Sequence, residues 1–175
     1  MLCMPRFRPL AAFLCLTFAL ILTHGAGGSE RPESVSLTLL YTNDVHGRLF
    51  PFDYEKLGER ETSVGGAARR AALIRQIKAS SCHPVLVMDA GDCFVGGPLA
   101  TLEGVPDFDV MNAVPYDVMT LGNHEFDGDL YKGHGGTEGL KILLDRIKQA
   151  HFPVLSANVS DSTTGKAIVP PYHIF

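Results

Sequence analysis

Apolar and polar residues follow two different periods along the chain, and the changes of period separate strands from helices. Four short apolar runs predict strands, at 35–42, 84–88, 117–121 and 152–157. Between them, apolar residues recur every three or four positions at 67–77 and 140–147, and a shorter helical segment is expected at 105–114. Strands that alternate with helices predict an α/β fold with a largely parallel sheet.

The two longer helices have defined core positions and are preceded by loops. The expected core positions are Ala67, Ala71, Ile74 and Ile77 in the first helix, and Leu140, Leu143, Leu144 and Ile147 in the other. The charged segment 50–63 and the glycine-rich segment 129–138 lack either period, so we expect both to be loops.

The N-terminus has the layout of a secretory signal peptide. A basic stretch, Met1–Pro9, precedes a 13-residue apolar run at 10–22, and Ala26 and Gly28 occupy plausible −3 and −1 positions for cleavage. A run of 13 is shorter than the roughly 20 residues that span a bilayer, which disfavours a retained anchor. We therefore expect residues 1–28 to be removed, and a secreted or periplasmic mature chain, 29–175, without a transmembrane helix.

Composition and charge exclude several classes of protein. Apolar residues make up 46% of the chain and charged residues 19%, so it is not intrinsically disordered. The whole chain carries 15 basic and 19 acidic residues; without the leader the balance is 13 to 19, a net charge of −6. Such an acidic chain is a poor partner for a nucleic-acid polymer. If the protein binds phosphate groups, metal ions or a few well-placed dipoles must supply the attraction.

Side chains that commonly bind metals follow three successive strands. They are Asp44 and His46 after the first, Asp92 after the second, and Asn123, His124 and Asp127 after the third. Each motif alone is typical of an ordinary turn or helix cap. Together they predict a site, because the carboxyl ends of parallel strands meet at one edge of the sheet. Carboxylate, imidazole and amide donors suit a divalent ion such as Zn, Mn, Fe or Mg.

Three segments resemble the first motifs of the metallophosphoesterase (calcineurin-like) superfamily, and specifically its secreted 5′-nucleotidase branch. The segments are LTLLYTNDVHGRL, VMDAGDCFVGGPLATL and YDVMTLGNHEFDGD, and the likeness extends over about 35–175. The resemblance implies part of the sandwich of that family, in which β-sheet layers are flanked by helices, with a sheet truncated at its C-terminal end. It also implies a metal-dependent hydrolase that releases phosphate from extracellular nucleotides, using two divalent ions such as Zn or Mn to activate water.

The resemblance assigns roles residue by residue. Asp44 and His46 bind the first ion, Asp92 bridges both ions, Asn123 binds the second, and His124 acts at the scissile phosphate with Asp127 holding its ring. Two ions about 3.5–4 Å apart can clamp phosphoryl oxygens, and a shared carboxylate is a natural bridge between them.

The family completes its metal centre with histidines from later Gly-His and Gly-His-x-His motifs. The only similar segment here, Gly133-His134-Gly135-Gly136, comes too early and has Gly136 where the second His should be, so we expect His134 to be a solvated loop residue. We therefore expect residues 29–175 to be the N-terminal part of a catalytic domain, without the C-terminal nucleotide-binding domain and with very low activity in isolation. Two alternatives stay open. One keeps the site but acts as a 2′,3′-cyclic-nucleotide phosphodiesterase, an apyrase or a nucleotide-sugar hydrolase. The other is a non-catalytic exported domain that binds a metal or a partner.

Overall fold

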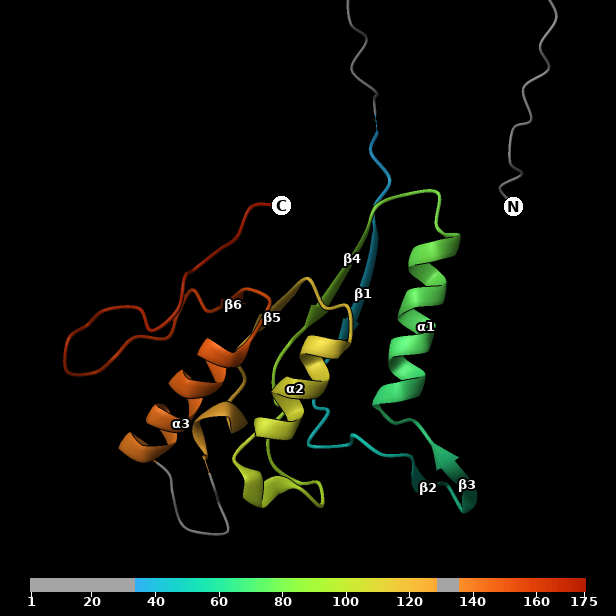
Figure 1. Cartoon of the computed structure of the whole chain (residues 1–175), viewed down its shortest axis with the longest axis horizontal. Helices are drawn as coiled ribbons and strands as arrows, with labels where there is room; N and C mark the ends of the chain where they lie inside the picture. The colour runs from blue at the N-terminus through green and yellow to red at the C-terminus, as the bar shows by residue number, and fades with distance from the viewer. Residues whose placement is uncertain (1–33, 129–135) are drawn as a thin grey trace, which may run out of the picture. The chain divides into compact units, whose positions relative to one another are not determined.

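The computed structural model describes residues 34–128 and 136–175, and its main element is a four-stranded sheet (Figure 1). The strands are β1 (Thr38–Thr42), β4 (Val85–Asp89), β5 (Val118–Thr120) and β6 (Val154–Leu155). They lie in the order β1-β4-β5-β6, and every neighbouring pair is parallel. The predicted α/β fold with a parallel sheet is confirmed. The predicted signal peptide, 1–28, and residues 129–135 of the predicted glycine-rich loop lie outside the described residues. The end of that loop prediction, 136–138, is wrong, because these residues form the first turn of a helix.

Three helices connect the strands in turn. They are α1 (Ala67–Ser80) before β4, α2 (Val105–Ala113) before β5 and α3 (Gly136–Gln149) before β6. Because sheet order follows chain order, right-handed crossovers place all three helices on the same face of the sheet. None of the helices in 34–128 and 136–175 is both long and apolar enough to cross a lipid bilayer.

The core lies between this helical layer and one face of the sheet. One cluster of buried side chains joins the three helices to alternate strand positions: Ala71, Ile74, Phe108, Met111 and Ile142 from the helices, and Val87, Met119 and Val154 from the strands. On the opposite face of β1, the side chains of Leu39 and Tyr41 are 52% and 73% exposed. The four-stranded sheet is therefore covered by one helical layer on one face, a partial form of the expected sandwich.

The prediction that 50–63 is a loop is wrong. The segment forms an antiparallel hairpin of β2 (Phe52–Lys56) and β3 (Glu59–Val64). Its two connecting residues, Leu57 and Gly58, have φ of 55° and 84°, as in the tight turns that match strand twist. Nearly every hairpin side chain is exposed, so the segment lacks the alternation of apolar and polar residues by which half-buried strands are predicted.

The core positions predicted for the helices are only partly correct. In α1, Ala67, Ala71 and Ile74 are buried as expected, whereas Ile77 is half-buried. In α3, Leu143 is fully buried and Leu140 and Ile147 are half-buried, but Leu144 is 36% exposed and the buried neighbour is Ile142. The buried stripe of α3 is rotated from its expected position, because packing against α2 and the sheet determines which side faces inward.

A buried carboxylate in the first turn of α2 weakens this core at neutral pH. Asp107 is only 4% exposed, and its Oδ1 atom has no hydrogen-bond partner. Burial raises the pKa of Asp107 to about 6; the nearby Glu125 raises it further and Arg70 opposes the shift. The folded chain therefore binds a proton more tightly at this site than the unfolded chain does.

We expect Asp107→Asn to flatten the pH dependence of stability. In the wild type, the free energy of unfolding falls as pH rises from about 4 through 6, because the buried carboxylate must ionise in that interval. The variant removes this cost, with a gain on the order of 3 kcal/mol at pH 7.5 and a smaller one, on the order of 1 kcal/mol, at pH 4.5. Urea unfolding at both pH values measures the difference.

Asp109→Asn is the matched control, since it removes one charge from the exposed side of the same helix. A gain for Asp107→Asn that is the same at both pH values would contradict this interpretation of the buried carboxylate.

Candidate metal centre

The loops that follow β1 and β4 run side by side, so that the pairing of these strands continues beyond their ends. Three N–H groups of the first loop donate to carbonyl oxygens of the second at 2.9–3.0 Å: Asp44 to Gly91, His46 to Asp92, and Gly47 to Cys93. This ladder holds Asp44 and His46 opposite Asp92, although nearly fifty residues separate them in the sequence.

A buried carboxylate joins the loop after β4 to the loop after β5. Glu125, in the helical turn η2 (His124–Phe126), is fully buried. Its two oxygens accept N–H groups from Asp92 at 2.9 Å, Cys93 at 2.8 Å and Gly122 at 2.6 Å. In return, Oδ1 of Asp92 accepts the N–H of His124 at 2.9 Å. The two loops therefore hold one another in place.

Their close approach requires glycine. Gly91 has φ of 92°, and a Cβ atom at this position would collide with the backbone of Gly122. A side chain at Gly91 or Gly122 would push the two loops apart and separate Asp92 from His124.

Three of the predicted residues bring donor atoms to one point. His46, Asp92 and His124 each offer one metal-ligating atom, and these atoms all lie within 4.8 Å of one another. The His46 and His124 rings meet edge to face with centroids 4.8 Å apart. Two ligands of an ion with bonds of about 2.1 Å can be at most about 4.2 Å apart, so small shifts would complete the site. The His46 imidazole and the Asp92 carboxylate are donors that suit Zn or Mn, and the His124 ring lies beside them.

The other three predicted residues surround this cluster. Oδ1 of Asp44 lies 3.6 Å from Nε2 of His46, and the Asp44 side chain is 56% exposed. Asn123 is exposed immediately before η2. Oδ2 of Asp127 lies 2.6 Å from Nδ1 of His124, which leaves Nε2 of that ring to face a ligand. The structure thus places all six residues on these three loops, and their individual roles stay predictions.

The backbone of the candidate centre is strained. Asp44, His46 and Asp92 have φ of 51°, 46° and 59°, in the left-handed region that residues with a side chain rarely adopt. Each such residue costs on the order of 1 kcal/mol or more, and the loop hydrogen bonds must offset this. Strain of this kind concentrates at functional sites, which supports a functional role for these loops.

A second buried carboxylate, which sequence reasoning did not select, fixes the end of β1. Oδ2 of Asp89 accepts a 2.5 Å hydrogen bond from the Thr42 hydroxyl, which also lies 2.7 Å from the hydroxyl of Tyr116. Burial raises the pKa of Asp89, while its hydrogen bonds to Thr42 and to the N–H of Gly91 oppose the shift. The signal in the sequence is a charged residue that ends an apolar strand.

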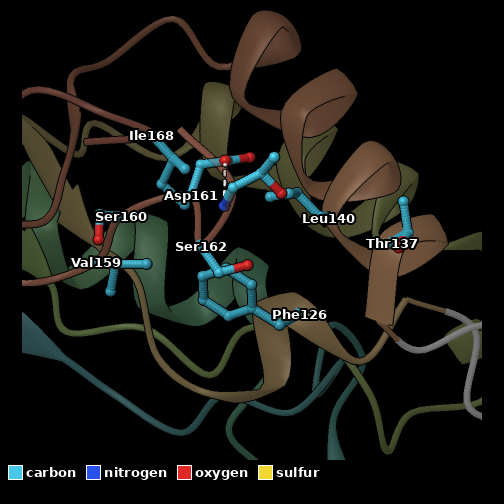
Figure 2. A pocket seen from close by; sticks show the side chains of 9 residues that line it. Phe126, Thr137, Leu140, Val159, Ser160, Asp161, Ser162 and Ile168 are labelled. Carbon is cyan, nitrogen blue, oxygen red and sulfur yellow. Dashed lines mark hydrogen bonds between the residues drawn. The ribbon is translucent and has the colours of Figure 1, made fainter. Parts of the chain in front are cut away.

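A separate cavity of about 450 Å³ lies between α3 and the loop at 159–163 (Figure 2). It shares only Phe126, from η2, with the region of the candidate centre. Its one carboxylate, Asp161, accepts N–H groups from Thr163 and Thr164, and these bonds, with Thr164 the stronger cause, lower the pKa of Asp161. The cavity offers no cluster of catalytic groups.

We expect Glu125→Gln to destabilise the chain by about 3 kcal/mol. The amide keeps the shape of the side chain but replaces one acceptor oxygen with an NH₂ group, which leaves buried backbone N–H groups without an acceptor. Glu138→Gln, an exposed change on α3, is the control and should stay within about 0.5 kcal/mol. Equal urea midpoints for the two variants would contradict the claim that the Glu125 carboxylate holds the two loops together.

Comparisons with known proteins identify the family of this chain. A family model described as calcineurin-like phosphoesterase matches residues 37–168. The chain is 36% identical to a 5′-nucleotidase of Vibrio cholerae over 170 residues, which are 95% of this chain and 28% of that protein. It is 39% identical to a 2′,3′-cyclic-nucleotide 2′-phosphodiesterase/3′-nucleotidase of Haemophilus influenzae, over 81% of this chain and 21% of the relative.

A solved structure shares the fold. The 5′-nucleotidase precursor of Thermus thermophilus superposes with a TM-score of 0.64 at 38% identity, over 79% of this chain and 26% of that one. The chain thus spans less than a third of the length of these relatives. The match of the family model to residues 37–168, which is most of the chain, shows that this chain belongs to the calcineurin-like phosphoesterase family.

Proposed function

We propose that this chain carries one part of the active centre of a metal-dependent phosphoesterase that acts on nucleotides. The observation that carries the proposal is the convergence of His46, Asp92 and His124, from three separate loops, within 4.8 Å. A bare cluster of this kind is not stabilising by itself, because it gathers polar groups on a strained backbone. A bound cation would offset that cost.

The roles that we propose follow the resemblance to the family. Asp44 and His46 would hold one ion, Asn123 a second, and Asp92 both, while His124 would hold a proton. Divalent ions in such a site supply Lewis-acid chemistry at phosphoryl oxygens and lower the pKa of water. The Asp92 N–H donates to the Glu125 carboxylate, which fixes the loop, and Oδ1 of Asp92 accepts the His124 N–H, which fixes the carboxylate.

His124 is suited to hold a proton for the leaving oxygen. Its Nδ1 lies 2.6 Å from Oδ2 of Asp127, which fixes the ring orientation and assigns the Nδ1 proton to that bond. Nε2 is then the atom that can present a proton to the leaving group. Asp127 acts through the ring as a positioning residue.

Nucleotides are the substrate class that we propose. The names of the two curated relatives, a 5′-nucleotidase and a cyclic-nucleotide phosphodiesterase/3′-nucleotidase, share this class and differ in the ester that is cleaved. Together with the predicted signal peptide, they support action on nucleotides outside the cytoplasm.

The direct test measures the binding of Mn²⁺ to the purified chain by electron paramagnetic resonance. We expect His46→Ala and Asp92→Ala each to weaken binding at least tenfold, because each removes a ligand from the same site. His151→Ala, at an exposed histidine before β6, is the control and should bind as the wild type does.

Hydrolysis of AMP and of p-nitrophenyl phosphate is measured on the same samples. Turnover by the wild type that His46→Ala abolishes would support an enzymatic function of this chain. Binding of Mn²⁺ that is insensitive to His46→Ala and Asp92→Ala would contradict the proposal, and binding without turnover would favour a chain that holds metal but is not catalytic alone.

A further inference from the structure

Next to the candidate centre lies a pocket of about 440 Å³ that the site described above does not use. Three arginines line it, Arg48, Arg69 and Arg70, and it shares Asp44 with the candidate centre. We call it the arginine pocket. The described residues include six arginines, so half of them gather here in a chain whose net charge is −4.

Each of these guanidinium groups has few or no hydrogen-bond partners within the described part of the chain, so N–H donors remain for a ligand. Arg48 lies over the ring of Phe52, 4.4 Å from its centroid. One nitrogen of Arg69 donates to the carbonyl oxygens of Ser63 and Gly65. The Nε atom of Arg70 is buried without a hydrogen-bond partner. A guanidinium has five N–H donors, so all three retain capacity for an anion.

The helix α1 adds a positive end to the same pocket. Gly65 and Gly66, which immediately precede the helix, line the pocket. Gly66 is the N-cap and offers no capping side chain, and the first turn contains no acidic residue. The N-terminus of a 14-residue helix favours negative charge. The apolar side chains of Val45, Phe52 and Leu73 also line the pocket.

We propose that the arginine pocket is a subsite for a second phosphate group of the substrate. The inference rests on the proposed function, because it takes the first phosphate to lie at the candidate centre, with which the pocket shares Asp44. Planar guanidinium groups match phosphate oxygens in pairs. The one acidic group on the wall, Asp44, belongs to the ion-holding set, and an ion there would offset its charge. The pocket thus selects substrates with two linked phosphates, such as nucleoside diphosphates.

The first experiment tests the pocket without the metal. Inorganic diphosphate is titrated by calorimetry into the metal-free chain, prepared over a chelating resin, at low salt. We expect saturable binding that Arg48→Gln and Arg70→Gln each weaken about tenfold, which corresponds to about 1.4 kcal/mol. Arg60→Gln is the matched control, because Arg60 is an exposed hairpin arginine that pairs with Asp53 outside the pocket.

Arg48→Gln is the decisive variant, since Arg70 also borders the buried carboxylates Asp89 and Asp107 and its replacement can unfold the chain. Absence of diphosphate binding by the wild type, an unchanged affinity of Arg48→Gln, or an equal loss in Arg60→Gln would each overturn the proposal.

The second experiment tests the substrate class on the Mn²⁺-loaded chain. ADP should bind at least tenfold more tightly than AMP, and Arg48→Gln should bring the two affinities within about twofold of each other. Equal affinities in the wild type would overturn the subsite. Failure of Mn²⁺ to bind through His46 and Asp92 would instead contradict the proposed function, while the metal-free titration would still decide whether the pocket takes phosphate.

Discussion

The carboxylate of Glu125 holds three backbone N–H groups from two loops, and the geometry of the candidate centre depends on this arrangement. Without it, the segment from Asp92 to Cys93 and the turn at Gly122 would have buried donors with no acceptor in the interior. A glycine pair, Gly91 and Gly122, permits the close approach that the carboxylate then fixes. The strained backbone of Asp92 is therefore held from both sides.

Polar side chains and strained backbone around the candidate centre lower the stability of the fold. Asp89, Asp107 and Glu125 are buried carboxylates, and three of the candidate ligands have left-handed backbone conformations. A domain selected only for stability would place apolar side chains and ordinary turns there. Apolar packing of the helices and the sheet offsets these local costs; Phe108, Met119 and Leu143 are almost completely buried in it.

The sequence predicted the part of the structure that follows from periodicity. Alternating strand and helix patterns indicate a parallel sheet, and a parallel sheet brings His46, Asp92 and His124 to one edge. The hairpin at Phe52–Val64 was not predictable in this way, because its residues are exposed on both faces. Glu125 was missed because no pattern distinguishes a buried glutamate from an exposed one in a loop. The choice of Ile142 over Leu144 depends on how α3 packs, which a helical period alone does not determine.

The measurement that tests the central claim most directly is anomalous diffraction at the manganese edge from crystals of this chain grown with Mn²⁺. We expect an anomalous peak within about 2.3 Å of ligand atoms of His46 and Asp92, at the meeting point of the three loops. A well-occupied peak elsewhere on the chain, or no peak at this point under saturating Mn²⁺, would contradict the claim that these loops form a metal centre.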